Sequence, residues 1–299
     1  MTHPAWIAAM RRGDFRTAHA ISDQVLAGRD PAHADDPRQP YHLRWVWDGR
    51  DLRGRDVLVR CYHGLGDTIQ FARYLAELRS LCASVTVEIQ PALLDLIATM
   101  RHGCQLIPFR PAAPAAPRER TIEIMELAHA LRRDAQGERV PYLRVNEQQQ
   151  QTRDALAVGL CWRAGDWDTA RSIPPERLRA ACALPAVQLG SLQYGVASDA
   201  HGLPALLTRG ADAITTARII MGLDLVITVD TMIAHLAGAL GRETWLLLKR
   251  DCDWRWMAGR TETPWYPTMR LYRQAGADWQ TPLAGLRRDL ALRARAAGC

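Results

Sequence analysis

The stretch L-D-L-V-I-T-V-D-T-M-I-A-H-L-A-G-A-L-G, residues 223–241, carries the clearest fold signal in the chain. Its first half is a short apolar run with several β-branched residues, which predicts a strand over 223–229. Asp230 and Thr231 follow, and these residue types commonly cap the start of a helix, here predicted over 232–240. An almost wholly apolar strand that leads directly into a helix is typical of a parallel sheet covered by helices on both faces.

The same alternation of strand and helix extends outward from this stretch. The second half of the chain predicts strands over 157–162, 187–192 and 244–248, and helices over 175–183 and 215–221. The first half predicts strands over 57–59, 85–89 and 105–108, and helices over 68–81 and 93–100. The polar run Q-Q-Q-Q at 148–151 separates the two series. We therefore predict an α/β protein with two Rossmann-like, doubly wound domains, over 41–150 and 151–299, facing each other across a cleft.

Residues 1–40 follow a different pattern. Apolar residues at helical spacing on both sides of Gly13 and Asp14 predict a short helical hairpin over 5–29. The motif G-D-F-x-x-A resembles the middle of a tetratricopeptide unit, but a lone unit cannot bury its apolar face without a neighbour. Residues 30–40 contain three prolines and several charges, which predicts a linker.

Composition excludes several classes of protein. No apolar run reaches about 18 residues, which predicts no transmembrane span, and residues 1–14 lack the apolar core of a signal peptide. The seven cysteines are odd in number and contain no C-x-x-C pair, which predicts reduced thiols in a cytoplasmic protein. The net charge is +6, and Lys249 is the only lysine among 38 basic residues. Because the arginines are spread along the whole chain, the charge favours small anionic ligands over nucleic acid.

The first cluster of candidate site residues is R-C-Y-H-G-L-G-D, which begins at Arg60, where the first predicted strand ends. Gly64 and Gly66 allow a tight turn and a close approach of a ligand to the backbone. Asp67 then begins a helix, and two interpretations stay open. Its carboxylate caps the helix, or it acts as a general base that takes a proton from an acceptor hydroxyl. Arg60 and His63 are candidates to bind an anionic acceptor or to assist that base.

A second cluster, G-L-C-W-R-A-G-D-W-D-T-A-R-S-I-P, follows the first predicted strand of the second half. Trp162 and Arg163 fall on this loop, and Arg171 lies just before a helix that begins at a proline pair. A guanidinium beside a helix N-terminus suits a diphosphate, since bidentate hydrogen bonds and the helix dipole act together. An ordinary solvated loop is the alternative interpretation.

The opening stretch supplies the third cluster. The first backbone N–H groups of its helix are expected to form an anion site, with Thr231, the Met232 amide and His235 as the ligand-facing groups. Asp230 is expected to cap the helix and hold the loop. A purely structural role is the alternative for His235.

The fourth cluster, residues 253–274, mixes aromatic residues with arginines. Aromatic faces stack on sugars or bases, so Trp254 is a candidate ligand contact, while packing of a long C-terminal connection explains most of this run. A helix predicted over 283–297 carries Leu286, Leu290 and Ala294 on one face. We expect this face to pack on the rest of the protein, and a peripheral contact with the inner-membrane surface is the second interpretation.

Together the four clusters resemble glycosyltransferase family 9, the ADP-heptose:lipopolysaccharide heptosyltransferases, and in particular its branch linked to tetratricopeptide repeats. The resemblance runs from about residue 47 to 274 and is carried by G-L-G-D-T-I-Q-F-A-R-Y-L, A-R-S-I-P, V-D-T-M-I-A-H-L-A-G-A-L-G, D-W-R-W-M and P-W-Y-P-T-M-R-L. The family implies a GT-B fold and an inverting sugar transfer. It implies no metal and no cofactor, with a nucleotide-diphosphate sugar as the donor substrate.

The resemblance also implies roles for single residues. Asp67 matches the aspartate proposed as base, and Arg171 matches a basic position, usually lysine, that contacts the donor diphosphate. Thr231, Met232 and His235 match the phosphate-binding turn. Heptosyltransferases carry glycine at the position of Met232.

Gln193 is a further candidate contact for donor or acceptor, and at the next position, Tyr194, repeat-linked relatives often place a basic residue. The predicted function is the transfer of a sugar, heptose among the options, from a nucleotide sugar to a hydroxyl of a glycan or a protein. The altered Met232 and Tyr194 leave a second hypothesis open, a catalytically degenerate module that binds a nucleotide sugar or a partner protein. Nucleic acid is not an expected partner.

Overall fold

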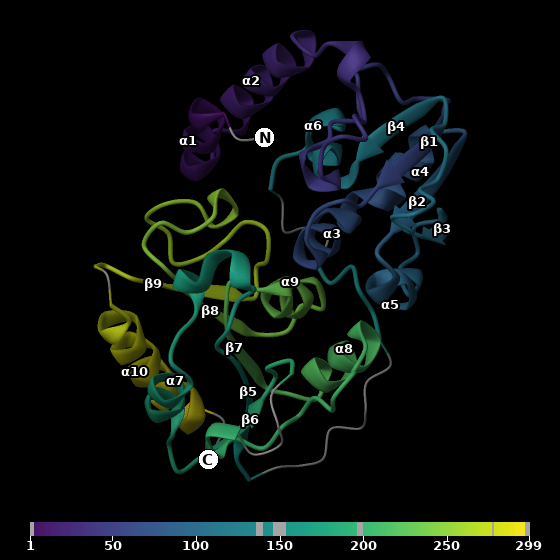
Figure 1. Ribbon diagram of the computed structural model, residues 1–299. Helices are drawn as coiled ribbons and strands as arrows, with labels where there is room; N and C mark the ends of the chain where they lie inside the picture. Colours follow the sequence, from purple (N-terminus) through teal and green to yellow (C-terminus); the bar gives the residue numbers. More distant parts are fainter. Residues whose placement is uncertain (1–2, 136–139, 146–153, 196–199, 277, 297–299) are drawn as a thin grey trace. The chain divides into compact units, whose positions relative to one another are not determined.

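The computed structural model describes residues 3–135, 140–145, 154–195, 200–276 and 278–296. The chain divides into two compact units, Met1–Tyr142 (unit 1) and Leu143–Cys299 (unit 2), and each is built around its own parallel sheet (Figure 1). This is the α/β architecture with two parallel sheets that the sequence predicts. The predicted linker at 148–151 lies outside the described residues. Among those residues, no helix is long and apolar enough to cross a membrane.

The sheet of unit 1 has the strand order β3-β2-β1-β4, and each neighbouring pair is parallel. The strands are β1 (Asp56–Arg60), β2 (Ser84–Ile89), β3 (Gln105–Pro108) and β4 (Arg120–Glu123). The helices beside them are α3 (Leu65–Phe71), α4 (Leu75–Leu81), α5 (Leu94–Ala98) and α6 (Leu127–Ala130). The single helix predicted over 68–81 is wrong in detail, because a 3-10 turn at Ala72–Tyr74 separates α3 from α4.

Strand β4 is absent from the sequence prediction. Its sequence, R-T-I-E, is short and charged at both ends, so it has no apolar run to mark it. It is a strand because it pairs with β1, with Val59 opposite Ile122 and Arg60 opposite Glu123. This pairing brings the end of β4 next to the end of β1, which matters for the site described below.

The N-terminal segment forms helices α1 (Pro4–Arg12) and α2 (Phe15–Ala27). Gly13 ends α1 with a φ of 74°, a conformation that glycine adopts without steric cost. The carboxylate of Asp14 caps α2 by accepting a hydrogen bond of 3.0 Å from the N–H of Thr17.

Helix α2 is attached to the rest of unit 1 through α6 and the turn before it. The Nδ1 atoms of His19 and His129 lie 3.0 Å apart, and the two rings stack. Arg29 forms an ion pair of 2.8 Å with the carboxylate of Glu126. The helical segment therefore packs on unit 1 rather than standing alone.

The sheet of unit 2 has the order β6-β5-β7-β8-β9, again with parallel pairs. The strands are β5 (Leu156–Cys161), β6 (Val187–Ser191), β7 (Leu225–Val229), β8 (Thr244–Leu248) and β9 (Met269–Arg273). The helices are α7 (Pro175–Cys182), α8 (Ala213–Met221), α9 (Met232–Ala239) and α10 (Gln280–Ala296). In Figure 1, α7 and α10 lie on one face of this sheet and α8 and α9 on the other.

The apolar face of α10 belongs to the core of unit 2. Leu286 and Leu290 are fully buried in one cluster with Leu178 of α7 and Ile227 of β7. The packing within the sheet is equally tight, since a Cβ added at Gly159 in β5 would lie 2.5 Å from Leu223. The face that a membrane contact through α10 would use is therefore covered within unit 2.

Candidate functional site

The predicted site residues gather at the carboxyl ends of the parallel strands, the usual ligand edge of such sheets. In unit 1 they follow β1 and begin α3. In unit 2 they follow β5 and β7 and begin α9.

At the unit 1 edge, Asp67 is the third residue of α3, and Gly64 is the residue that caps this helix. The Oδ2 atom of Asp67 accepts a hydrogen bond of 2.9 Å from the backbone N–H of Gly64. A Cβ at Gly64 would lie 3.2 Å from the same oxygen, so glycine leaves room for this contact. Gly66 lies in the first turn of α3. The half-buried Asp67 carboxylate thus stabilises the start of its own helix.

His63 lies beside Asp67 and is held by a residue that the sequence does not single out, Glu123 at the end of β4. The His63 Nδ1 and Glu123 Oε1 atoms are 3.0 Å apart, and Gln90 donates a hydrogen bond of 2.8 Å to the His63 carbonyl. Burial lowers the pKa of His63, but the hydrogen bond and charge of Glu123, together with the charge of Asp67, outweigh it and raise the pKa. The carboxylates of Glu123 and Asp67 thus stabilise the protonated form of this imidazole relative to a free histidine side chain.

Arg60 has a different environment from that of a ligand contact. Only 2% of its side chain is exposed, and the guanidinium contacts Asp35, the Tyr62 hydroxyl and, at 2.8 Å, the carbonyl of Ala115. Its Nε lies 3.7 Å from the buried carboxylate of Glu88. The structure thus places Arg60 in the interior of unit 1, where it ties two loops to β1.

At the unit 2 edge, Thr231 caps α9, and its hydroxyl accepts a hydrogen bond of 3.2 Å from the N–H of Ile233. Asp230 does not cap the helix, so that part of the prediction is wrong. Its backbone carbonyl instead accepts a hydrogen bond of 2.9 Å from Arg171 Nη1. Thr231 and Met232 are half-buried, whereas the remainder of α9 is buried. The accessible end of this helix is therefore its N-terminus.

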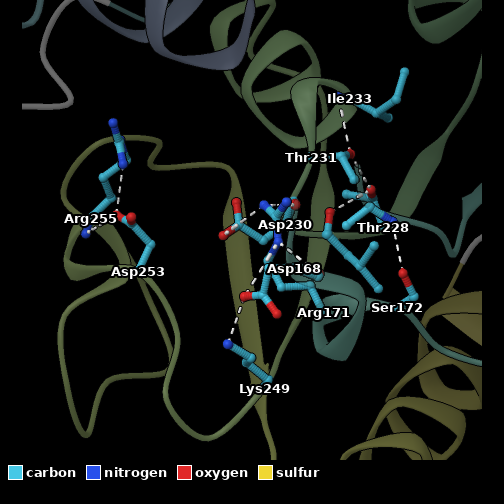
Figure 2. A network of polar contacts seen from close by, with 12 residues as sticks. Asp168, Arg171, Ser172, Thr228, Asp230, Thr231, Ile233, Lys249, Asp253 and Arg255 are labelled. Atoms are coloured by element: carbon cyan, nitrogen blue, oxygen red, sulfur yellow. Dashed lines mark hydrogen bonds and ion pairs between the residues drawn. The ribbon is translucent and has the colours of Figure 1, made fainter. Parts of the chain in front are cut away.

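Arg171 ends a 3-10 turn over Asp166–Arg171 and is surrounded by charged groups (Figure 2). Its side chain is 11% exposed, with Nη1 3.8 Å from the Asp230 carboxylate and Nε 3.9 Å from that of Asp168. Lys249, the residue after β8, forms an ion pair of 2.7 Å with the same Asp168 oxygen. Burial first, and then the charge of Asp253, raise the pKa of Asp230 to about 6, although Arg171 acts in the opposite direction.

His235 lies one turn into α9, in the interior of unit 2. It is 5% exposed, its Nδ1 is 3.0 Å from the Tyr266 hydroxyl, and its ring stacks on Trp256. These contacts bury His235 in the interior of unit 2, so it has the structural role that was the alternative for this residue, while Thr231 and Met232 remain half-buried.

The other predicted contacts of unit 2 surround the end of β5. The Gln193 side-chain oxygen accepts hydrogen bonds from the backbone N–H groups of Trp162 and Arg163, at 3.3 and 2.9 Å. Trp162 is buried, whereas the Arg163 side chain is exposed and pairs with Asp166 at 2.8 Å. Gln193 therefore fixes the backbone of this loop.

Two further aromatic residues, Trp254 and Tyr194, make contacts within unit 2. Trp254 is half-buried, packs edge-on against Trp265, and carries the Arg255 guanidinium 4.6 Å above its ring. Tyr194 is 38% exposed, and its hydroxyl is hydrogen-bonded to Thr216.

Three residues at these two edges, Glu123, Asp168 and Lys249, are not predicted from the sequence. Glu123 is missed because β4 is missed. Asp168 stands inside the quoted second cluster, and Lys249 is unique in composition, but no sequence signal connects them. Only the parallel order of β7 and β8 brings Lys249 to the loop after β5. Among the residues that the structure describes, no group of three or more His, Cys, Asp or Glu side chains is placed to hold a metal ion.

Comparison with known proteins gives one curated relative. No family model matches the sequence. Protein FlbA of Caulobacter vibrioides (strain ATCC 19089 / CIP 103742 / CB 15) is 24% identical over 288 residues, which cover 81% of this chain and 47% of that protein. The chain therefore spans about half the length of this relative.

Solved glycosyltransferases share the fold at low sequence identity. E. coli ADP-heptose lipopolysaccharide heptosyltransferase II is 14% identical, with 82% of this chain and all of that chain covered and a TM-score of 0.56. The glycosyl transferase family 9 protein of Veillonella parvula DSM 2008 is 12% identical, with 75% and 87% covered and a TM-score of 0.52. TibC of enterotoxigenic E. coli H10407, in complex with ADP-D-β-D-heptose, is 13% identical, with 83% and 78% covered and a TM-score of 0.55.

This chain has the fold of family 9 glycosyltransferases. The sequence motifs predict this α/β glycosyltransferase fold. Because each identity is below 25%, these similarities show the fold alone.

Proposed function

We propose that this protein is an inverting, metal-independent glycosyltransferase that moves a sugar from a nucleoside-diphosphate sugar to a hydroxyl of a glycan or a protein. One observation carries the proposal. The half-buried N-terminus of α9 and the guanidinium of Arg171 meet at the carboxyl ends of β5 and β7, and a hydrogen bond of 2.9 Å from Arg171 to the Asp230 carbonyl joins them. Membership of the branch of family 9 linked to tetratricopeptide repeats, which the sequence motifs resemble, belongs to the same proposal.

This arrangement suits a diphosphate for physical reasons. The first N–H groups of a helix have no partner within the helix, and the helix dipole favours negative charge beside them. Thr231 accepts one of these N–H groups, and its cap is neutral, so it adds no charge against an anion. A guanidinium next to the helix start adds charge-assisted hydrogen bonds. In sugar transfer the diphosphate gains charge as it leaves, so groups fixed at this point stabilise the transition state.

The acceptor half of the reaction is assigned to unit 1. Asp67 is the proposed general base that takes the proton from the acceptor hydroxyl as its oxygen attacks the anomeric carbon. His63 lies beside Asp67 and is fixed by Glu123 at 3.0 Å, so it is available to orient an acceptor hydroxyl next to that carboxylate. No cofactor is proposed, and the nucleotide sugar is the donor substrate. The complex of TibC with ADP-D-β-D-heptose makes ADP-heptose the first donor to test.

The test uses the full chain and a panel of nucleotide sugars that includes ADP-heptose. A true donor is expected to raise the unfolding temperature by mass action and, with a lipopolysaccharide-core or protein acceptor, to release nucleoside diphosphate. The anomeric configuration of the product, determined by NMR, is expected to be opposite to that of the donor. If no nucleotide sugar shifts the unfolding temperature, the proposal is wrong.

A nucleotide-sugar-binding module without turnover is the second candidate. It is favoured by the contact of Asp67 with the Gly64 N–H, which gives this carboxylate a structural task independent of catalysis. The two candidates differ in one readout. Specific binding of a donor, without transfer of its sugar to any acceptor or to water and hence without release of nucleoside diphosphate, is expected for the module alone.

A further inference from the structure

A second cation, Lys249, lies close to Arg171 in unit 2 (Figure 2). It directly follows β8, is the only lysine of the sequence, and its Nζ atom is 2.7 Å from Asp168 Oδ2. Both side chains are largely buried, with exposures of 24% and 19%. The Coulomb attraction within an ion pair that has limited access to water is less screened than that within an exposed pair.

The charges around Arg171 show why a second cation matters there. The carboxylates of Asp168 and Asp230 lie 3.9 and 3.8 Å from the guanidinium nitrogens of Arg171. Arg255 pairs with Asp253 at 2.8 Å, so these two charges balance each other. With Arg171 alone, an arriving diphosphate would meet more negative than positive charge at this edge. Lys249 supplies the cation that balances Asp168.

Position adds to the effect of charge. Asp168 interrupts the 3-10 turn with φ −148° and ψ 83°, and its carbonyl lies 3.5 Å from Arg171 Nε. The Asp168 carboxylate is close to two cations, with Lys249 Nζ at 2.7 Å and Arg171 Nε at 3.9 Å, so its stronger attraction is to Lys249. If Lys249 were lost, Arg171 would be the nearest cation shown for this carboxylate. An arginine–carboxylate pair is the same kind of contact that a phosphate needs.

We propose that Lys249 is a positioning residue for the diphosphate site: by holding and neutralising the Asp168 carboxylate, it prevents this carboxylate from competing with a nucleoside diphosphate for Arg171. The inference rests on the proposed function, because it deepens the donor site described there. Lys249 acts through Asp168 and not by contact with the ligand. The effects of substituting the two residues on ligand affinity must therefore be non-additive.

Binding of ADP and of inorganic pyrophosphate to the full chain, measured by isothermal titration calorimetry, tests this coupling. Lys249→Met is expected to weaken binding of both probes by at least about ten-fold. Asp168→Asn in the same background is expected to restore the affinity to within about three-fold of the unmodified chain. Lys249→Arg is expected to keep most of the affinity, because it retains the positive charge.

Arg250→Met is the matched control. It removes one positive charge at the adjacent, exposed position, and no change in affinity is expected. Thermal unfolding of each variant checks that it is folded, and Lys249→Arg keeps the test decisive if Lys249→Met does not fold.

Two results would overturn the inference while leaving the donor site intact. One is unchanged ADP affinity in Lys249→Met. The other is a loss of affinity that persists in Lys249→Met/Asp168→Asn, which would show that Lys249 contacts the ligand itself. If the unmodified chain binds neither ADP nor pyrophosphate, the proposed function is wrong and the positioning role falls with it.

Discussion

Units 1 and 2 each end a central parallel strand with a loop and a helix, yet the two helix starts carry opposite chemistry. At α3 the Asp67 carboxylate occupies the helix start and accepts the Gly64 N–H. At α9 the cap is the neutral hydroxyl of Thr231, and the nearby carboxylates of Asp230 and Asp168 each lie beside a cation, Arg171 or Lys249. Since a carboxylate at a helix start repels a second anion, α3 is unsuited to a phosphate. We therefore propose that the same local geometry serves as a proton acceptor in unit 1 and as an anion site in unit 2.

The largest expected effect comes from the proton acceptor. Asp67→Asn keeps a side-chain oxygen for the Gly64 N–H but cannot take up a proton. We expect the rate of transfer to fall by about 10²–10⁴-fold, with ADP affinity unchanged, as measured by nucleoside-diphosphate release and by calorimetry. Turnover that persists at the original rate would remove Asp67 from the mechanism.

The next effect concerns the anion site. Arg171→Met removes the guanidinium beside α9, and we expect ADP to bind about 10–100-fold more weakly, because hydrogen bonds to charged groups contribute about 1.5–3 kcal/mol. Arg163→Met is the control, since its exposed guanidinium pairs with Asp166. Equal losses of affinity in the two variants would argue against a specific role for Arg171.

A third prediction uses the pH dependence of stability in unit 2. The pKa of Asp230 is about 6 in the folded protein, against an ordinary value of 3.8. The folded state therefore holds this proton more tightly, so stability from this group is present below about pH 4 and is lost as the pH rises through 6. Asp230→Asn is expected to raise the free energy of unfolding by about 2 kcal/mol at pH 7.5.

Chemical denaturation across this pH range measures the difference. The advantage of Asp230→Asn should disappear near pH 3.5, where both side chains are neutral. A variant that is less stable than the parent at pH 7.5 would show that the ionised carboxylate stabilises unit 2 through Arg171.

The smallest expected effect has the opposite sign and lies in unit 1. Burial first, and then the charge of Arg132, lower the pKa of His129 to about 4. The unfolded chain takes up this proton first, so stability falls between about pH 6.5 and pH 4. We expect His129→Gln to reduce this fall by about 1 kcal/mol in the same denaturation series. If His129→Gln leaves the pH dependence of stability unchanged, the lowered pKa of His129 does not cause the fall in stability.

Much of this comparison could be predicted from the sequence, and the missing parts have physical reasons. Buried strands such as β7 have apolar runs, and helix starts such as that of α9 have capping residues, so both leave local signals. Strand β4 and its Glu123 leave none, because R-T-I-E becomes a strand only by pairing with β1. The contact between Lys249 and Asp168 depends on strand order, which no local pattern encodes.

The sequence also predicts some candidate ligand residues better than others. The motifs locate Thr231 and Arg171 correctly at the end of the sheet, because position along the chain determines that edge. They do not reveal that His235 is buried against Tyr266 and Trp256, or that Arg60 is an interior residue. Which way a side chain faces depends on packing partners that are distant in sequence.

Backbone amide NMR of the full chain during titration with ADP tests the central contrast between the two helix starts most directly. The account predicts shifts of the amides at 231–233 and of the Arg171 side chain, with the amides at 64–68 unchanged. Shifts at 64–68 without shifts at 231–233 would contradict it, because the anion would then bind at the helix start that carries Asp67.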